Sequence, residues 1–399
     1  MKIISSDKFS DVSVSVRSIF DLRNETITAM NLLLYMLRQK TEKYPDKQKL
    51  TSELSNNYAM NVAAYLRSYG DQLLFDLRFQ YIRSDWIEKE DYEEKVLELM
   101  DQFMNHVLFD QEGLDEAKYL LRNRLMRQKD DPNTYSILKA FSIIEEDCSL
   151  RIPMQGDLDQ IEEIQLEQIQ ALWNEMKTLP KSIYVCGKPS DLIVDYLKSY
   201  KEASIKANYQ IFQSNQQYVY EEEMDIRQSN LTLLYQSGVS VESEDYFPLF
   251  VLNSLLGQSP NSLLFSEIRE KHSFCYSIYS QLIRFEGVIV INTGLKKEYI
   301  DLALDLIDQQ IKRLQEGDFS LELLDIAKKD IKDAIVSAQD SGFSMISQSY
   351  LDDLLHRPLH MNERLEAIDA VSVEQIQKVA KKLSCFAKVM IKEKENESL

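Results

Sequence analysis

The sequence predicts an α+β fold made of two homologous domains, each an antiparallel sheet with helices packed against one face. Three observations support this prediction. Short sequence words recur in the same order at a nearly constant offset, and the order of strand-like and helix-like segments in the first half returns in the second. Hydrophobic residues make up 44% of the 399 residues, which is enough for sizeable cores and excludes wholesale disorder.

The repeated words lie about 210 residues apart, which indicates a duplicated chain. One short word alone would mean little, because helical words recur by chance. Three in the same order favour two homologous domains, predicted over residues 1–200 and 229–399, with a polar, acidic linker over 201–228. The matching pairs are 52–54 with 266–268, 114–118 with 324–328, and 161–170 with 368–377.

In the first half, the alternation of Val12, Val14 and Val16 predicts a strand that begins the segment 12–22. Apolar residues at helical spacing then predict a helix over 26–38. The remaining expected elements are strands over 61–67, 72–81 and 183–186 and helices over 91–107 and 114–128.

The second half repeats this order. A strand over 230–236 precedes a helix over 246–256, for which Gly257 is a natural C-cap residue. The other expected elements are a short helix over 262–271, strands over 276–283 and 288–293, helices over 297–315 and 320–338, and a closing strand over 386–391.

Composition excludes several classes of function. The chain has 65 Asp and Glu against 46 Lys and Arg, a formal charge of −19 that disfavours binding to nucleic acid or to anionic membranes. Only 10 glycines are present, which argues against a glycine-loop nucleotide enzyme. We expect a cytoplasmic protein with no signal peptide, no membrane insertion and four reduced, widely spaced cysteines.

Part of the second half resembles a known family. Residues 251–257 read VLNSLLG, residues 261–271 read NSLLFSEIREK, and Tyr276 follows. This order resembles the second-domain motif of the insulinase, pitrilysin and mitochondrial processing peptidase family of zinc metallopeptidases, and the likeness extends along nearly the whole chain. The resemblance implies two such domains in a clam-like arrangement and, in active members, a zinc site on the first domain.

The zinc-binding residues of that family are missing here. Residues 31–45 (NLLLYMLRQKTEKYP) resemble the family's inverted zinc motif HxxEH with its flanks. Asn31 and Tyr35 stand at the two His positions, Leu34 at the Glu position, and Arg124 at that of the downstream Glu ligand. Zinc needs neutral imidazoles and a carboxylate base, and a guanidinium repels it. We therefore expect a degenerate bacterial-type member without metal, cofactor or activity of its own.

A replacement metal site is not expected. Only four histidines are present, and His356 and His360 alone have an i, i+4 spacing. Pro358 lies between them and interrupts a regular helix, so the segment is interpreted as a surface turn. His272 is surrounded by charged residues and is expected to be solvated.

One pair of functional residues remains. The resemblance implies that Arg269 and Tyr276 correspond to an Arg and a Tyr that contact substrate in the family. Such an Arg can bind a peptide carbonyl or carboxylate, and such a Tyr can hydrogen-bond an oxyanion. The alternative interpretation is structural: an ion pair of Arg269 with Glu267 or Glu270, and Tyr276 as an ordinary strand residue.

These observations predict a non-catalytic, substrate-binding subunit of a heterodimeric zinc endopeptidase that processes or degrades peptides. Its partner would be a homologous subunit with HxxEH, which alone would carry the zinc, and substrates would bind by adding a strand to a sheet edge. Two alternatives stay open: a structural scaffold subunit and an autonomous peptide-binding protein. Retention of Arg269 and Tyr276 argues against the scaffold.

Overall fold

The computed structural model describes residues 1–394, which form two compact units. Unit 1 comprises Met1–Met126, Pro153–Asn208 and Ala338–Pro358. Unit 2 comprises Arg127–Ile152, Tyr209–Ser337 and the described chain from Leu359 onward. Each unit therefore includes one segment from the other half of the sequence. We keep the boundaries 1–200 and 229–399 as a proposal for the extent of the two sequence repeats.

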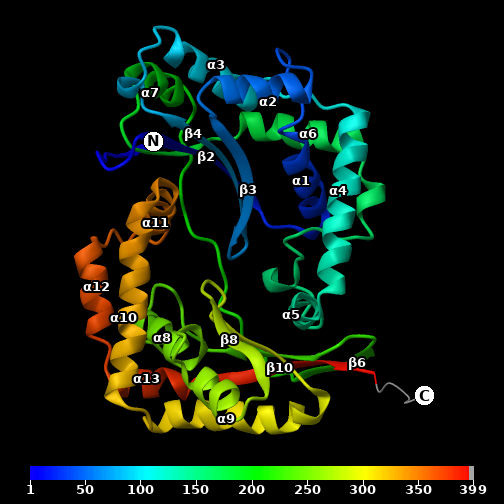
Figure 1. The fold of residues 1–399 in the computed structure, drawn as a ribbon, viewed down its shortest axis with the longest axis vertical. Helices are drawn as coiled ribbons and strands as arrows, with labels where there is room; N and C mark the ends of the chain where they lie inside the picture. Colours follow the sequence, from blue (N-terminus) through cyan, green and yellow to red (C-terminus); the bar gives the residue numbers. More distant parts are fainter. Residues whose placement is uncertain (395–399) are drawn as a thin grey trace. The chain divides into compact units, whose positions relative to one another are not determined.

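Unit 1 is built on a five-stranded sheet in the order β1-β5-β2-β4-β3. The edge pair β1–β5 is parallel and the other pairs are antiparallel, so the predicted antiparallel sheet carries one parallel edge strand. Figure 1 labels β2, β3 and β4. The strands are β1 (Lys2–Ile4), β2 (Asp11–Asp21), β3 (Asn61–Tyr69), β4 (Gln72–Ile82) and β5 (Ser182–Cys186).

Helices cover both faces of this sheet. The valines of β2 are buried on one face, while Ser13, Ser15 and Arg17 alternate with them and lie buried on the other. The helix α11 packs against β2 and β5, and its Tyr350 ring lies 4.5 Å from the guanidinium carbon of Arg17. The helices are α1 (Asn24–Met36), α2 (Lys47–Asn56), α3 (Tyr92–Asn105), α4 (Gln111–Asp130, which continues into unit 2), α6 (Leu166–Thr178), α7 (Asp191–Lys198) and α11 (Gly342–Leu354).

Unit 2 has a sheet of the same design. Its order is β6-β10-β7-β9-β8, again with one parallel pair, β6–β10, at one edge. Strand for strand this matches the sheet of unit 1, which agrees with the predicted duplication. The strands are β6 (Tyr218–Met224), β7 (Ser229–Gln236), β8 (Cys275–Ile283), β9 (Val288–Leu295) and β10 (Ser384–Glu393).

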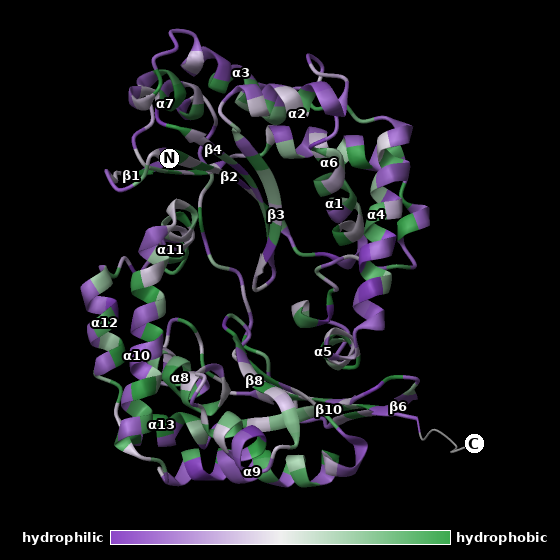
Figure 2. Cartoon of the chain, in the orientation of Figure 1, coloured by the Kyte–Doolittle hydropathy of each residue, from purple (hydrophilic) through white to green (hydrophobic). Residues whose placement is uncertain are grey.

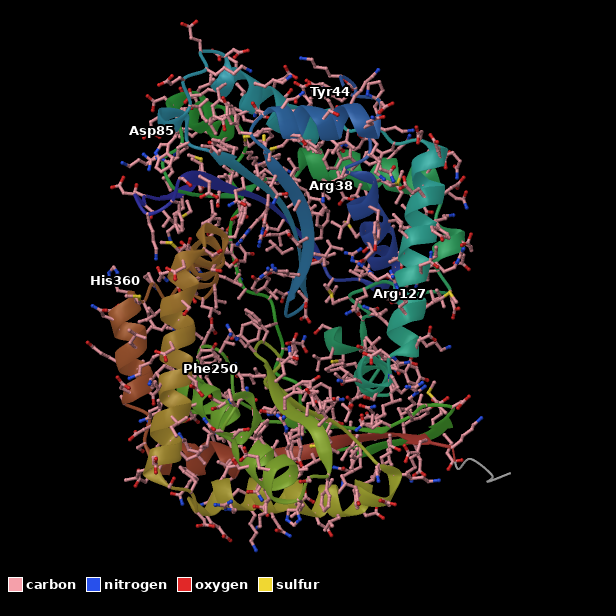
Figure 3. All side chains as sticks on the ribbon, viewed as in Figure 1. Arg38, Tyr44, Asp85, Arg127, Phe250 and His360 are labelled. Atoms are coloured by element: carbon pink, nitrogen blue, oxygen red, sulfur yellow. The ribbon has the colours of Figure 1, made fainter. Side chains whose placement is uncertain are left out.

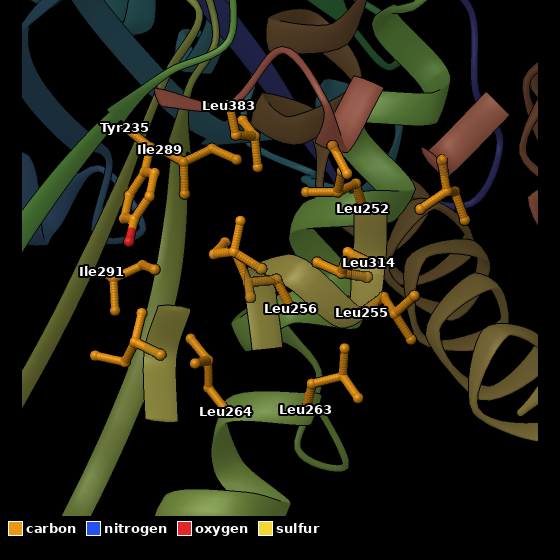
Figure 4. Packing of buried hydrophobic residues seen from close by; sticks show 14 of the residues in the cluster. Tyr235, Leu252, Leu255, Leu256, Leu263, Leu264, Ile289, Ile291, Leu314 and Leu383 are labelled. Atoms are coloured by element: carbon orange, nitrogen blue, oxygen red, sulfur yellow. The ribbon is translucent and has the colours of Figure 1, made fainter. Parts of the chain in front are cut away.

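The main core of unit 2 lies between this sheet and the helices on one face. Figure 4 shows leucines of α8 and of the following π-helical segment packed beside Ile289 and Ile291 of β9. A smaller core on the other face is covered by α5. The helices are α5 (Pro132–Ser142), α8 (Tyr246–Asn253), α9 (Ile300–Glu316), α10 (Leu321–Ser337), α12 (Met361–Asp369) and α13 (Val373–Ala380), with π-helical segments η4 (Ser254–Gln258) and η5 (Phe265–Lys271).

The α+β fold with two similar domains is confirmed. Besides the parallel edge pair in each sheet, three details differ from expectation. The expected linker contains β6, and each sheet has one helix on its second face. Gly257 is not a left-handed cap: it lies inside η4, where an added Cβ would come within 2.6 Å of the backbone nitrogen of Ser280. Glycine is needed there because η4 packs closely against β8.

Figure 2 shows hydrophilic and hydrophobic residues intermixed along the helices, as expected for helices with one buried face. Across the described residues, no helix combines the length and apolarity that a membrane span requires.

Candidate functional site

Three of the four degenerate zinc positions are joined by contacts in unit 1, namely Asn31, Tyr35 and Arg124. Asn31, Leu34 and Tyr35 lie on α1, and Arg124 lies on α4. The Nη2 atom of Arg124 donates a hydrogen bond of 2.8 Å to Oδ1 of Asn31. Its guanidinium carbon lies 5.7 Å from the centre of the Tyr35 ring. The structure thus places Arg124 beside Asn31, which lies 93 residues earlier in the sequence. The family resemblance assigns both residues to the degenerate zinc positions.

A loop over residues 153–157 lies against this cluster. The carbonyl of Gln155 accepts a 2.7 Å hydrogen bond from Arg124, and the carbonyl of Met154 accepts one of 3.1 Å from Asn31. Gly156 has a φ of +94°, a backbone conformation that favours glycine. The loop uses Gly156 to turn close to α1, where an added Cβ would lie 3.5 Å from the Cα atom of Thr28. Sequence reasoning missed this loop because its contacts are made by main-chain carbonyls.

Asn31, Leu34 and Arg124 offer neither an imidazole nor a carboxylate to a metal ion or a water molecule. The amide of Asn31 is buried and already donates to Ile27 and Met154. Arg124 is a permanent cation with donors only, and Leu34 offers neither acid nor base. Throughout residues 1–394, no three His, Cys, Asp or Glu residues gather in a metal-binding arrangement. That these positions are remnants of a zinc site is implied by the resemblance.

The histidines are dispersed. His356 lies in a turn with a φ of +48°, and His360 caps the N-terminus of α12, so the segment 356–360 is not helical, as predicted. His106 lies 2.8 Å from a carboxylate oxygen of Glu42. His272 is partly buried, and its ring centre lies 5.0 Å from that of Phe274.

Arg269 and Tyr276 come together in unit 2. The guanidinium carbon of Arg269 lies 4.4 Å from the centre of the Phe265 ring and 5.4 Å from that of Tyr276. The cation therefore contacts two aromatic rings, a favourable arrangement because the ring faces carry negative charge. Sequence reasoning missed Phe265, although its position four residues before Arg269 on a predicted helix could have indicated the contact.

Local backbone features present these side chains. Arg269 lies in η5, and π-helical segments are rare and often occur at functional sites. Ser273 has a φ of +57°, which turns the chain from η5 into β8. A bulge between Cys275 and Ile278 interrupts the β8–β9 pairing, and Tyr276 there is 81% exposed. The irregular start of β8 is what brings Tyr276 to the surface.

The contacts of Arg269 differ from the structural interpretation, in which it pairs with Glu267 or Glu270. The carboxylate of Glu267 lies 2.7 Å from Lys271 and 3.3 Å from His272, and within residues 1–394 Arg269 forms no ion pair. Burial raises the pKa of the neighbouring Cys275 thiol, so this cysteine is not an activated nucleophile. The arrangement offers a guanidinium and a phenol to a ligand but no group for covalent catalysis.

Comparisons with known proteins identify the family. Residues 182–331 match the family described as the peptidase M16 inactive domain. The chain is 24% identical over 413 aligned residues to the probable inactive metalloprotease YmfF of Bacillus subtilis, covering 99% of this chain and 96% of that protein. It is 27% identical over 164 residues to the uncharacterized zinc protease YmxG of the same species, covering 40% of this chain and 39% of YmxG.

Among solved structures, a conserved protein from Enterococcus faecalis has the same fold. It superposes with a TM-score of 0.91 at 22% identity, covering 99% of this chain and 96% of the other. Together with the duplicated sheets and the absence of HxxEH at residues 31–35, these matches lead to one conclusion. The chain belongs to the insulinase, pitrilysin and mitochondrial processing peptidase family, also called M16, as an inactive peptidase homologue.

Proposed function

We propose that the chain is the non-catalytic, substrate-binding subunit of a heterodimeric zinc endopeptidase that processes or degrades peptides. The observation that supports this most is the state of Arg269. Its guanidinium is held against Phe265 and Tyr276 with no ion pair among the described residues, although the protein carries 65 acidic residues. A cation left unpaired in an acidic protein is available to a ligand.

The chemistry of this pair suits a peptide. The guanidinium can donate two parallel hydrogen bonds to a carbonyl or carboxylate, and the exposed Tyr276 hydroxyl can donate to a developing oxyanion. β8 is an edge strand, paired on one side by β9, so its other side is open to an added strand. A peptide held along β8 would have its backbone near both side chains.

The catalytic metal would come from the partner. The Arg124 guanidinium is hydrogen-bonded to Asn31 where the family places zinc ligands, so a homologous subunit carrying HxxEH would supply zinc and the activated water. YmxG of Bacillus subtilis, named as a zinc protease, is a relative of this chain and an example of the kind of partner we expect. We also propose a cytoplasmic location, which the four free cysteines support.

The test is reconstitution with an HxxEH-bearing homologue encoded in the same genome. The two purified chains are mixed and followed by size-exclusion chromatography and by cleavage of a quenched fluorescent peptide. We expect co-elution and cleavage that requires both chains. A partner that is fully active alone and whose cleavage rate does not change on addition of this chain would refute the proposal. Co-elution without any change in rate would favour a scaffold.

A further inference from the structure

A pocket of about 400 Å³ lies at the end of β8 farther along the chain from Tyr276. Its lining includes Phe250 of α8, Gln258 of η4, Tyr279 of β8 and Arg284 in the β8–β9 turn. Phe250 is labelled in Figure 3. The guanidinium carbon of Arg284 lies 5.2 Å from the centre of the Phe250 ring. An arginine beside an aromatic ring therefore follows β8, just as Arg269 precedes it.

The pocket carries hydrogen-bond donors that have no partner among residues 1–394. Over the described residues, the Arg284 guanidinium forms neither an ion pair nor a hydrogen bond, and the Tyr279 hydroxyl forms no hydrogen bond. The Oε1 atom of Gln258 accepts a 2.8 Å hydrogen bond from the buried Asn253. This bond fixes the amide and leaves its NH₂ group free to donate.

The lining contains no Asp or Glu, although these residues number 65 in the chain. A guanidinium, an amide NH₂ and a phenol match a ligand that only accepts hydrogen bonds. Burial, and after it the charge of Asp131, raises the pKa of the Tyr279 phenol, so the guanidinium of Arg284 is the group in the pocket that attracts an anion. A carboxylate fits best, because it accepts at two oxygens and pairs with the planar guanidinium in a fixed geometry.

The pocket is bordered by a closely packed contact between η4 and β8. The contact of η4 with β8 requires Gly257, as described above, and the Ser280 hydroxyl donates a 3.0 Å hydrogen bond to the carbonyl of Asn253. Both π-helical segments of unit 2 therefore border β8. One carries Gln258 and the other carries Arg269.

The length of β8 determines how far the pocket lies from Tyr276 along a bound peptide. An extended peptide along β8 advances about 3.3 Å per residue, so the six steps from Tyr276 to Leu282 span about 20 Å. Resting on the function proposed above, we propose that this pocket is a specificity subsite for a carboxylate of the peptide. The carboxylate would lie about six to eight residues from the part of the peptide that contacts Tyr276.

The carboxylate could belong to a side chain or to the peptide's C-terminus, and a set of probes separates the two sources. The probes are fluorescein-labelled peptides of about 12 residues built from Thr, Val, Ser and Gln, a length that spans β8. One Glu is moved along the sequence, each peptide is made with a free or an amidated C-terminus, and all-neutral amidated peptides serve as reference. Fluorescence anisotropy measures Kd for the full-length chain alone.

We expect the wild-type chain to prefer peptides with a carboxylate at one register. Arg284→Gln should weaken those peptides about tenfold or more, because a charge-assisted hydrogen bond is lost, and should not affect the neutral amidated peptides. Arg227→Gln is the matched control: it removes the same charge from an exposed arginine in the loop before β7 and should change nothing. A preference that survives amidation assigns the site to a side chain, and one lost on amidation assigns it to the C-terminus.

Equal affinity of wild type and Arg284→Gln for every carboxylate peptide would overturn the subsite. If Arg269→Ala still weakened binding in that case, the proposed function would stand without the pocket. If Arg284→Gln weakened the binding of charged and neutral peptides equally, the carboxylate subsite would also be overturned. If no peptide binds the wild-type chain, both the pocket and the proposed peptide-binding role fail.

Discussion

Gly257→Ala tests the close packing that builds the pocket. An added Cβ would lie 2.6 Å from the backbone nitrogen of Ser280, 2.8 Å from its Oγ and 2.9 Å from its Cβ. Real Cβ atoms do not approach backbone so closely, so η4 or β8 must shift. Overpacking of this kind costs about 1–3 kcal/mol. At about 2–4 °C per kcal/mol for a unit of this size, the expected fall in Tm is about 2–12 °C.

Gly294→Ala is the control for this substitution. Gly294 also lies in unit 2, on β9, but the atoms nearest its added Cβ would belong to side chains: the end of the flexible Gln228 side chain at 3.0 Å and Oδ1 of Asn230 at 3.6 Å. Thermal unfolding followed by circular dichroism should show a lower Tm for Gly257→Ala and little change for Gly294→Ala. Equal Tm values for the two variants would refute the argument that η4 and β8 need glycine at their contact.

Three further predictions concern unit 1. After dialysis, the purified chain should contain less than one zinc per molecule by plasma mass spectrometry, because Arg124 is hydrogen-bonded to Asn31; a stoichiometric zinc lost on substituting His356 would contradict this. Burial lowers the pKa of Lys181 from 10.5 to about 8, so between these pH values the unfolded chain binds more protons than the folded chain. The free energy of unfolding should therefore rise with pH by up to about 3 kcal/mol more in wild type than in Lys181→Met. Urea titrations that give the same pH dependence of this free energy for both proteins would sink the idea. Arg17→Met should cost about 3 kcal/mol, because it removes one cation from the fully buried Asp76, 3.5 Å away; an unchanged urea midpoint would contradict this.

The regular elements could be predicted because local pattern determines them. The alternation of Val12, Val14 and Val16 identified β2, and helical spacing identified α1. The recurrence of 161–170 at 368–377 also has a structural basis, because both segments lead into a helix through a capping box. These features depend only on neighbours in sequence.

Features that depend on distant packing could not be predicted. The apolar face of α11 has the same pattern whichever sheet it covers, so the sequence did not reveal that a helix from the second half packs on β2. Gly257 follows a helical run, which favours a cap, but β8 determines its role. The aromatic contact of Arg284 with Phe250 joins residues far apart in sequence, and no motif marks it.

The candidate site was predicted in part. The resemblance suggested Arg269 and Tyr276, and the structure brings the two side chains together. Its ring partner Phe265 and the bulge that exposes Tyr276 were found only in three dimensions. Bulges and π-helical segments leave no strong sequence pattern, because they arise where packing overrides regular hydrogen bonding.

The central claim is that Arg269 and Tyr276 hold substrate for a zinc-bearing partner, and kcat/KM of the reconstituted complex tests it most directly. Removal of a well-aimed oxyanion donor lowers rate about a hundredfold, so complexes containing Arg269→Ala with Tyr276→Phe should lose at least that much in kcat/KM. Lys271→Ala, which removes a positive charge two residues from Arg269, should leave it nearly unchanged. Association and thermal unfolding should stay normal in all variants. Wild-type kcat/KM in the double variant would contradict the claim and favour the scaffold.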